Sequence, residues 1–263
     1  MPQAYSEIDL YDQPAIYDII FDAGTEQEAD FLEQVHAKHG DCRGRRWLEP
    51  ACGTGRVMIA LARRGCRMVG IDLSEPMLAH ARQRARELGI RMSLKQAAME
   101  DFSLRGQFDL AYCLISSFKY LATEAQAVAH LQRMAAHLRP GALYVLGLHL
   151  TDYDRDRPVH ERWVETVDGT LVICNTRTWP AERRQRRERV RNRLVIKKAR
   201  GETLRYESSW DFRTYDAAQI RRLVRAVPTL TLVACYDFQH EVTCPRDLDD
   251  SQEDIVLVLR KER

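Results

Sequence analysis

The sequence predicts an α/β protein built on a doubly wound, mostly parallel β-sheet. Three observations support this fold. Strand and helix signals alternate between residues 45 and 150, the glycines Gly53 and Gly55 separate a buried strand from a helix, and Asp72 closes the next strand. Alternating strands and helices build parallel sheets, whose ligands lie at the carboxyl ends of the strands. The sequence therefore predicts a ligand site at that edge of the sheet.

The expected elements follow one another along the chain. Residues 12–38 have the pattern of two short amphipathic helices divided near Gly24. Hydrophobic periodicity predicts strands near 45–50, 67–72, 91–96, 108–114 and 142–149, and helices over 56–64, 75–88 and 123–138. A helix over 216–226 and an antiparallel pair of strands over 230–238 and 254–260 are expected to complete the sheet.

Residues 155–213 interrupt this alternation. The β-rich segments 162–167, 171–179, 190–199 and 203–212 are joined by turns such as Asp168-Gly169, which predicts an inserted antiparallel sheet. The insertion contains 16 Lys and Arg against nine Asp and Glu, whereas the whole chain has a formal net charge of +2. We expect an N-terminal helical cap over 1–40, a core over 41–154 plus 214–263, and an inserted β domain over 155–213.

Composition limits the class of protein. A chain of 263 residues with 45% hydrophobic composition can bury one α/β core. No apolar run reaches the roughly 18 residues of a membrane helix, and residues 1–7 lack the pattern of a signal peptide. A cytoplasmic location is therefore expected. Seven cysteines without CxxC spacing indicate neither a disulfide framework nor a zinc site.

The turn between the first core strand and the first core helix predicts a nucleoside site. Only glycine takes a positive φ without steric cost and lets a ligand lie against the backbone, which explains Gly53 and Gly55. Asp72 stands where a carboxylate accepts the ribose hydroxyls of a bound nucleotide. A dinucleotide fold would have a third glycine where this chain has Met58, which disfavours an NAD-dependent oxidoreductase.

The segment 49–55 resembles motif I of the class I S-adenosylmethionine (SAM)-dependent methyltransferases, acidic-x-G-x-G-x-G, with Ala51 in place of the first glycine. The resemblance continues in family order through 69–78, 108–118 and 138–146. It implies a seven-stranded Rossmann-like sheet, SAM as cofactor and S-adenosylhomocysteine as product. It also implies that the insertion, after strand five, covers the acceptor site. The chain is most similar to the small-molecule type, which includes aminosugar N-methyltransferases and glycine-type amine methyltransferases.

The resemblance also implies which residues bind the cofactor. They lie in an N-terminal Tyr-Asp segment and in the loops that follow the strands, and comprise Tyr11, Glu49, Ala51, Cys52, Gly53, Gly55, Arg56, Asp72, Leu73, Met77, Ala98, Met99, Glu100, Cys113, Leu114 and Ser117. The family's aspartate that accepts from the adenine amino group is matched by Ala98. The Met99 backbone or the Glu100 side chain is expected to replace it.

The loop 114–118 narrows the choice of acceptor. It lacks the Asn/Asp-Pro-Pro-aromatic motif of enzymes that methylate base amines or glutamine amides, and it lacks the carboxylates of the magnesium-dependent catechol type. A metal-free transfer to an amine or hydroxyl of a small molecule remains. Tyr17 and His149 are the candidate catalytic residues, because a histidine at the end of a strand can remove a proton. Candidate substrate residues are Phe118, Trp210, Arg213 and His240, each with packing as its structural alternative.

The basic run 183–193 raises the alternative of a nucleic-acid partner. It lacks interleaved aromatic residues for base stacking, so an exposed hairpin edge is the favoured interpretation. If the insertion faces the acceptor, its positive excess favours a phosphate or carboxylate held by Arg205 or Arg213. An RNA-directed methyltransferase and a non-catalytic SAM-binding protein remain alternatives. The sequence does not indicate the oligomeric state.

Overall fold

The computed structural model describes residues 4–199 and 201–262. Residues 1–3, Arg200 and Arg263 lie outside the described residues. Residues 1–3 begin the predicted cap and the N-terminus expected to carry no signal peptide, Arg200 belongs to the predicted insertion, and Arg263 ends the predicted core. The helices are α1 (Pro14–Phe21), α2 (Thr25–His39), α3 (Arg56–Arg63), α4 (Glu75–Glu87), α5 (Glu124–His137) and α6 (Ala217–Arg225). The strands are β1 (Ser6–Glu7), β2 (Arg46–Pro50), β3 (Arg67–Asp72), β4 (Ser93–Gln96), β5 (Phe108–Cys113), β6 (Leu138–His149), β7 (Val159–Val167), β8 (Thr170–Thr178), β9 (Arg187–Lys197), β10 (Thr203–Arg213), β11 (Leu230–Tyr236) and β12 (Asp254–Lys261).

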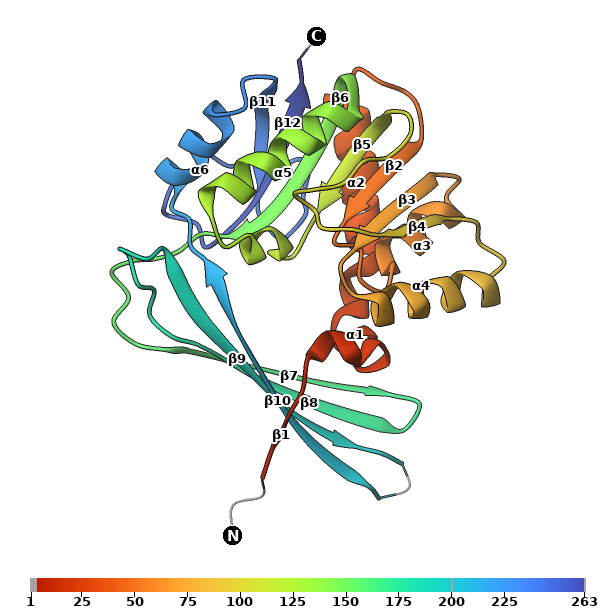
Figure 1. The fold of residues 1–263 in the computed structure, drawn as a ribbon, viewed down its shortest axis with the longest axis vertical. Helices are drawn as coiled ribbons and strands as arrows, with labels where there is room; N and C mark the ends of the chain where they lie inside the picture. The colour runs from red at the N-terminus through yellow and green to blue at the C-terminus, as the bar shows by residue number, and fades with distance from the viewer. Residues whose placement is uncertain (1–3, 200, 263) are drawn as a thin grey trace.

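The strands form two sheets (Figure 1). The seven-stranded sheet has the order β11-β12-β6-β5-β2-β3-β4, and β12 runs antiparallel to both of its neighbours. The predicted seven-stranded α/β fold is therefore confirmed. The five-stranded sheet, β1-β10-β9-β8-β7, lies below it in Figure 1, with α1 at the junction. Within the described ranges, no helix combines the length and apolar character needed to cross a membrane.

Helices cover both faces of the seven-stranded sheet. One hydrophobic cluster joins the sheet to α5 and α6, and a second joins the opposite face to α2 and α3. Every residue of β5 is buried, as expected for a central strand of a sheet covered on both sides. Two details differ from the sequence expectation. β6 begins at Leu138 directly after α5, and β1, with only two residues, is too short to give a periodic signal.

A buried ion pair joins α2 to α3. The Arg56 guanidinium donates to both carboxylate oxygens of Glu28, at 2.9 and 2.8 Å, and to the Thr25 hydroxyl at 2.9 Å. The two charged side chains are only 9% and 6% exposed. Burying two charges is costly unless each satisfies the other, so removing one partner would leave an uncompensated charge inside the protein.

The five-stranded sheet places different chemistry on its two faces. Arg189 pairs with Asp211 and Arg193 with Glu207, whereas the alternate β9 residues Val190 and Asn192 are buried on the other face. Successive side chains of a strand point to opposite faces, which separates the arginines from the buried residues. The expected exposed hairpin edge is wrong, because β9 lies between β8 and β10 in the sheet.

We expect Arg56→Met to lower the free energy of unfolding by about 3–5 kcal/mol, because the buried Glu28 carboxyl would lose the cation that compensates its charge. Urea denaturation without ligand measures this value. The matched control is Arg82→Met, whose partner Glu75 lies at 2.5 Å in a pair that is 40% and 52% exposed. Loss of such an exposed pair is expected to cost about 0–1 kcal/mol. Equal losses in the two variants would contradict a structural role for the buried pair.

Candidate active site

The turn between β2 and α3 has the geometry of a close ligand contact. Ala51, Gly53 and Gly55 adopt φ values of 55°, 51° and 69°. A Cβ added at Gly53 would meet no atom within 4 Å, so this turn borders open space. Ala51 takes the left-handed conformation despite its side chain, a strain that the surrounding fold must sustain. Backbone can therefore lie directly against a ligand at Gly53.

Asp72 ties the loops after β2 and β3 together. Its carboxylate accepts the backbone N–H of Gly53 and of Ser74, each at 2.8 Å. The next side chain, Leu73, is 67% exposed, an unusual position for a large apolar group. A carboxylate with remaining lone pairs beside an exposed apolar side chain fits the ribose and adenine of the expected cofactor. Met77 lies fully buried beneath this loop.

Glu49 is a half-buried acid at the start of the turn. The Tyr112 hydroxyl donates to its Oε2 at 2.8 Å. Burial is the main cause that raises the pKa of Glu49 to about 8, with a smaller opposing effect from Tyr112. The carboxyl is therefore largely protonated near neutral pH, and a nearby cation would favour its ionised form.

The predicted adenine loop is in contact with α5 through His130. Nδ1 of His130 lies 2.9 Å from the Met99 carbonyl oxygen, and Nε2 lies 2.6 Å from the Tyr144 hydroxyl. Burial lowers the pKa of His130 to about 4, so its ring is neutral and donates from Nδ1 to the carbonyl. Glu100 accepts a bond from Gln126 at 3.1 Å. The sequence analysis missed His130, and the adenine roles of Ala98, Met99 and Glu100 remain predictions.

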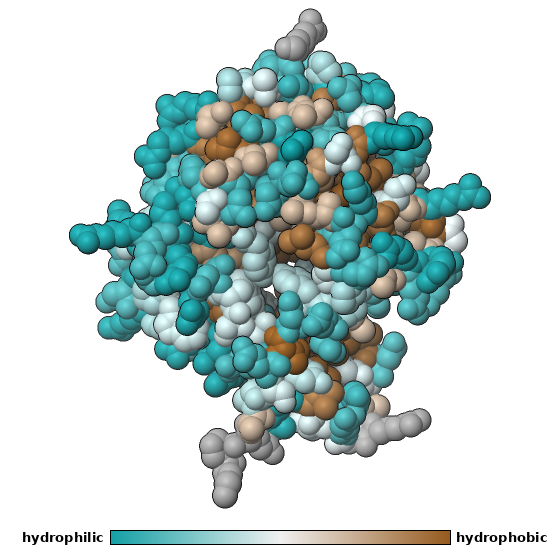
Figure 2. Space-filling model, viewed as in Figure 1, coloured by the Kyte–Doolittle hydropathy of each residue, from teal (hydrophilic) through white to brown (hydrophobic). Residues whose placement is uncertain are grey.

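A cavity of about 1240 Å³ lies between the two sheets. Figure 2 shows the surface hollowed at this junction. Its lining comes from the N-terminal segment, the loops after β5 and β6, and one face of the five-stranded sheet. Six predicted site residues line it: Tyr11, Tyr17, Ser117, His149, Trp210 and His240. Among the residues that the structure describes, no group of three metal-ligating side chains occurs.

Several predicted residues lie elsewhere. Phe118 is fully buried against His130, and Arg213 donates to Glu124 at 2.7 Å instead of facing the cavity. Arg56 is engaged by Glu28, as described above. Burial raises the pKa of the Cys113 thiol to about 12, and the pKa of Cys52 is also raised, so both thiols stay protonated. These two cysteines are packing residues without nucleophilic character.

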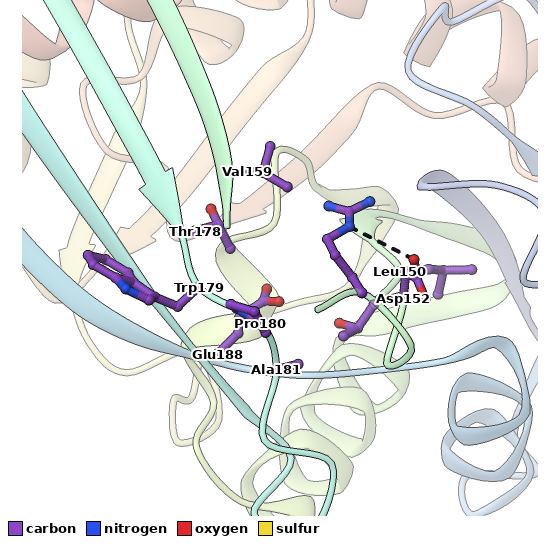
Figure 3. Close-up of a pocket in the computed structure, with 10 residues that line it drawn as sticks. Leu150, Asp152, Val159, Thr178, Trp179, Pro180, Ala181 and Glu188 are labelled. Atoms are coloured by element: carbon purple, nitrogen blue, oxygen red, sulfur yellow. Dashed lines mark ion pairs between the residues drawn. The ribbon is translucent and has the colours of Figure 1, made fainter. Parts of the chain in front are cut away.

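A second, small pocket adjoins the cavity (Figure 3). It has a volume of about 40 Å³ and is bordered by Trp179 and Pro180. Arg155, which also lines it, lies 3.9 Å from Asp152. This space admits only a few water molecules, so it is too small for an acceptor.

Aromatic side chains form one wall of the large cavity. The Tyr11 hydroxyl donates to the Tyr120 hydroxyl at 2.7 Å, and the Tyr11 ring lies 6.0 Å from that of Tyr17. Tyr120 packs in turn against Phe212 and Trp210, at ring distances of 4.8 and 6.3 Å. Burial raises the pKa of Tyr17, so its phenol is neutral and cannot act as a base near neutral pH. Tyr120 was not predicted from the sequence, although it lies only two residues after segment 108–118, which resembles the methyltransferase family.

His149 and Asp254 form a hydrogen-bonded pair at the cavity rim. Nδ1 of His149 contacts the Asp254 carboxylate, and its backbone N–H donates to the Ser116 hydroxyl at 3.1 Å. The carboxylate can only accept, so Nδ1 donates to it, and Nε2 is the ring nitrogen left for another partner. The imidazole is 47% exposed and lines the cavity. His149 is therefore an oriented potential base, and Asp254 is a partner that the sequence analysis missed.

His240 has a different environment. Burial lowers its pKa to about 4, so it remains neutral, and its ring stacks on Phe238 at 6.0 Å. Its Nε2 has no hydrogen-bond partner among the described residues, and neither does the indole nitrogen of Trp210. Both atoms could hydrogen-bond to a molecule in the cavity.

Comparisons with known proteins agree with this geometry. Residues 48–141 match the family model described as "Methyltransferase domain". A dTDP-3-amino-3,6-dideoxy-alpha-D-glucopyranose N,N-dimethyltransferase from Streptomyces fradiae is 38% identical over 99 residues, which are 38% of this chain and 37% of that protein. A glycine/sarcosine N-methyltransferase from Parasynechococcus marenigrum is 31% identical over 164 residues, 59% of this chain and 56% of that protein.

Solved structures are similar over almost the full chain. A SAM-dependent methyltransferase from Clostridium acetobutylicum has a TM-score of 0.78 at 17% identity, covering 97% of this chain and 100% of that one. The predicted resemblance and fold are thereby confirmed. The sequence matches, in contrast, span between 35% and 56% of the curated relatives' own length.

We expect Gly53→Val to weaken SAM binding by about 100-fold or more, roughly 2.7 kcal/mol, because the branched side chain would occupy the open space beside the turn. Calorimetry measures the affinity. The matched control is Gly65→Val, which also has a positive φ, +88°, and also meets no atom within 4 Å. Both variants should lose about 1–2 kcal/mol of stability from backbone strain. Similar SAM affinities in the two variants would contradict the assignment.

The raised pKa of Glu49 predicts a pH dependence of stability. The folded protein retains a proton between the ordinary pKa of 4.5 and about 8, so the free energy of unfolding should fall as pH rises through this range. Glu49→Gln cannot ionise and should be more stable than the parent by roughly 2–4 kcal/mol above about pH 8.5, and equally stable near pH 5. Denaturation at both pH values tests this. The exposed Glu165→Gln serves as control, and parallel pH profiles for all three proteins would contradict it.

Proposed function

We propose that this protein, whose residues 48–141 match the model of a methyltransferase domain, transfers a methyl group from SAM to an amine or hydroxyl of a small molecule in the cavity between the two sheets. Residues 155–213 would act as the cover of that cavity. One observation carries the proposal. The glycine turn at Gly53 borders open space and is tied by Asp72, and the oriented imidazole of His149 lines the large cavity that would hold the acceptor.

The residues divide the work of the reaction. Bound SAM supplies an electrophilic methyl group on a sulfonium. Asp72 would accept the ribose hydroxyls, and Leu73 would cover one face of the adenine. Tyr11, hydrogen-bonded to Tyr120, bridges the N-terminal segment and the core, which restricts water in the cavity. Positioning of this kind is the main contribution that a protein makes to a displacement reaction.

His149 would accept the acceptor's proton at Nε2. The Asp254 carboxylate would stabilise the resulting imidazolium, because it already accepts from Nδ1. A hydroxyl needs its proton removed near the transition state, whereas a neutral amine attacks with its own lone pair and releases a proton afterwards. The pair can take the proton from either acceptor. Tyr17, with its raised pKa, would donate a hydrogen bond and leave proton removal to His149.

The alternatives have less support. Four of the seven arginines that suggested RNA pair with Asp211 or Glu207, on the face of the sheet opposite the cavity-lining residues Val190 and Asn192; they are Arg187, Arg189, Arg191 and Arg193. The anionic acceptor also lacks the expected contacts, because neither Arg205 nor Arg213 lines the cavity. A non-catalytic SAM-binding protein would have no use for an oriented His149–Asp254 pair.

We expect His149→Gln to lower kcat by about 10²–10⁴-fold, the usual contribution of a general base, with an unchanged Kd for SAM. Asp254→Asn should lower kcat less, because His149 would remain but would lose the carboxylate that orients it. S-adenosylhomocysteine release from a panel of small amines and hydroxyl compounds measures kcat, and calorimetry measures Kd. His160→Gln, on the edge strand β7 of the five-stranded sheet, is the control, because His160 does not line the cavity. A full kcat in His149→Gln would contradict the assigned base, and absence of SAM binding in the parent would contradict the proposed function.

A further inference from the structure

Four polar residues form a row across the cavity-facing side of the five-stranded sheet. Strand register places Glu161 opposite Thr176, Thr176 opposite Asn192, and Asn192 opposite Ser208, one residue from each of β7, β8, β9 and β10. Directly opposed residues share a face and lie about 5 Å apart. All four line the cavity, and Thr176, Asn192 and Ser208 are 5–8% exposed. We name these four residues the polar row.

The position of the polar row in the sheet is informative. The adjacent row contains Cys174 and Leu194, which pack against Leu10 and Tyr17 from the N-terminal segment. That apolar row is closed by the chain itself, whereas the polar row opens into the cavity. Packing against the N-terminal segment thus explains the apolar residues Cys174 and Leu194. It does not explain why the next row is polar.

The polar row has unused hydrogen-bonding capacity. The Thr176 hydroxyl donates to Asn192 Oδ1. Within 4–199 and 201–262, the Asn192 amide nitrogen, the Ser208 hydroxyl and the Glu161 carboxylate have no side-chain hydrogen-bond partner. Asn192 and Ser208 are largely removed from bulk water and require partners, which a ligand in the cavity would supply. Glu161, at the edge of the row, is exposed and free to meet a ligand as it enters.

The charges around the cavity favour a cationic ligand. Seven carboxylates line it, against the two cations Lys119 and Arg155. Both cations are engaged, Lys119 with Glu188 at 2.6 Å and Arg155 with Glu253. The carboxylates of Glu7, Asp9 and Glu161 have no cation within 4 Å among the described residues. The lining therefore has free negative charge and no free positive charge.

We propose that the polar row binds the acceptor, and that the acceptor is an unphosphorylated, hydroxylated amine. Glu161 would pair with its ammonium group on binding, and Thr176, Asn192 and Ser208 would bond its hydroxyls. The ammonium would give one proton to His149 before the amine lone pair forms the new C–N bond and the S–CH3 bond of SAM breaks, leaving S-adenosylhomocysteine. The aromatic wall formed by Tyr120 and Trp210 would contact its apolar faces and favour its positive charge. A phosphate or diphosphate would meet carboxylates without a free arginine or lysine. This inference rests on the proposed function and assigns its substrate class.

Matched probes that differ only in a phosphate test the proposal. Glucosamine is compared with glucosamine 6-phosphate, and kanamycin with its 3′-phosphate, by S-adenosylhomocysteine release from the full chain. In at least one pair, the kcat/KM of the free amine should be about tenfold or more above that of its phosphorylated counterpart. The phosphate would place its negative charge near the carboxylates of the cavity. Calorimetry of SAM binding accompanies each assay.

The variants Glu161→Gln and Glu165→Gln separate binding from general charge effects. Glu165 lies on the same strand but does not line the cavity. Glu161→Gln should raise the KM for the free amine about tenfold, with a nearly unchanged kcat, and reduce the discrimination against phosphate. Glu165→Gln should leave both unchanged.

Three outcomes would overturn the substrate class while SAM still binds: equal or better turnover of the phosphorylated probes, no turnover of either free amine, or equal KM values in the two variants. Loss of SAM binding in the parent protein would instead overturn the proposed function together with this inference.

Discussion

The Asp72 carboxylate is the constraint on which the cofactor side of this protein depends. By accepting the N–H groups of Gly53 and Ser74, it holds the loops after two parallel strands at a fixed separation. The same carboxylate caps a turn in which Ala51 and Gly53 are left-handed. A charge-assisted bond from each loop offsets this backbone strain, and both loops remain open to solvent on the side where a ligand would lie.

The sequence contains enough information to predict the seven-stranded sheet and the resemblance to methyltransferases. Those predictions depend on local signals: the glycines of the turn, the acid that closes β3 and the hydrophobic periods of the core. Met58 is one such local signal, because it stands where a dinucleotide fold would have its third glycine. Its sulfur would lie 2.6 Å from a Cβ at Gly70, so the chain moves the close helix–strand contact from a glycine on α3 to a glycine on β3.

The rest of the site could not be predicted because it depends on tertiary pairing. Asp254 lies 105 residues from His149, and they meet only because β12 pairs with β6. Lys119 and Glu188 meet across the two sheets in the same way. The positive charge of the insertion gave a poor prediction of the acceptor for a related reason. Its net excess is real, but strand alternation places several of the arginines on the face that does not line the cavity.

The alternation of β9 has an evolutionary consequence. One strand presents arginines to one side and Val190, Asn192 and Leu194 to the other, so its pairing register decides which set faces the cavity. Shifting that register by a single residue would exchange the two sets and bring Arg191 and Arg193 inward. A one-codon insertion or deletion in the turns that flank β9 is thus a shorter route to a cavity of opposite charge than any series of point substitutions. Such a change would leave the turn at Gly53 and the His149–Asp254 pair untouched.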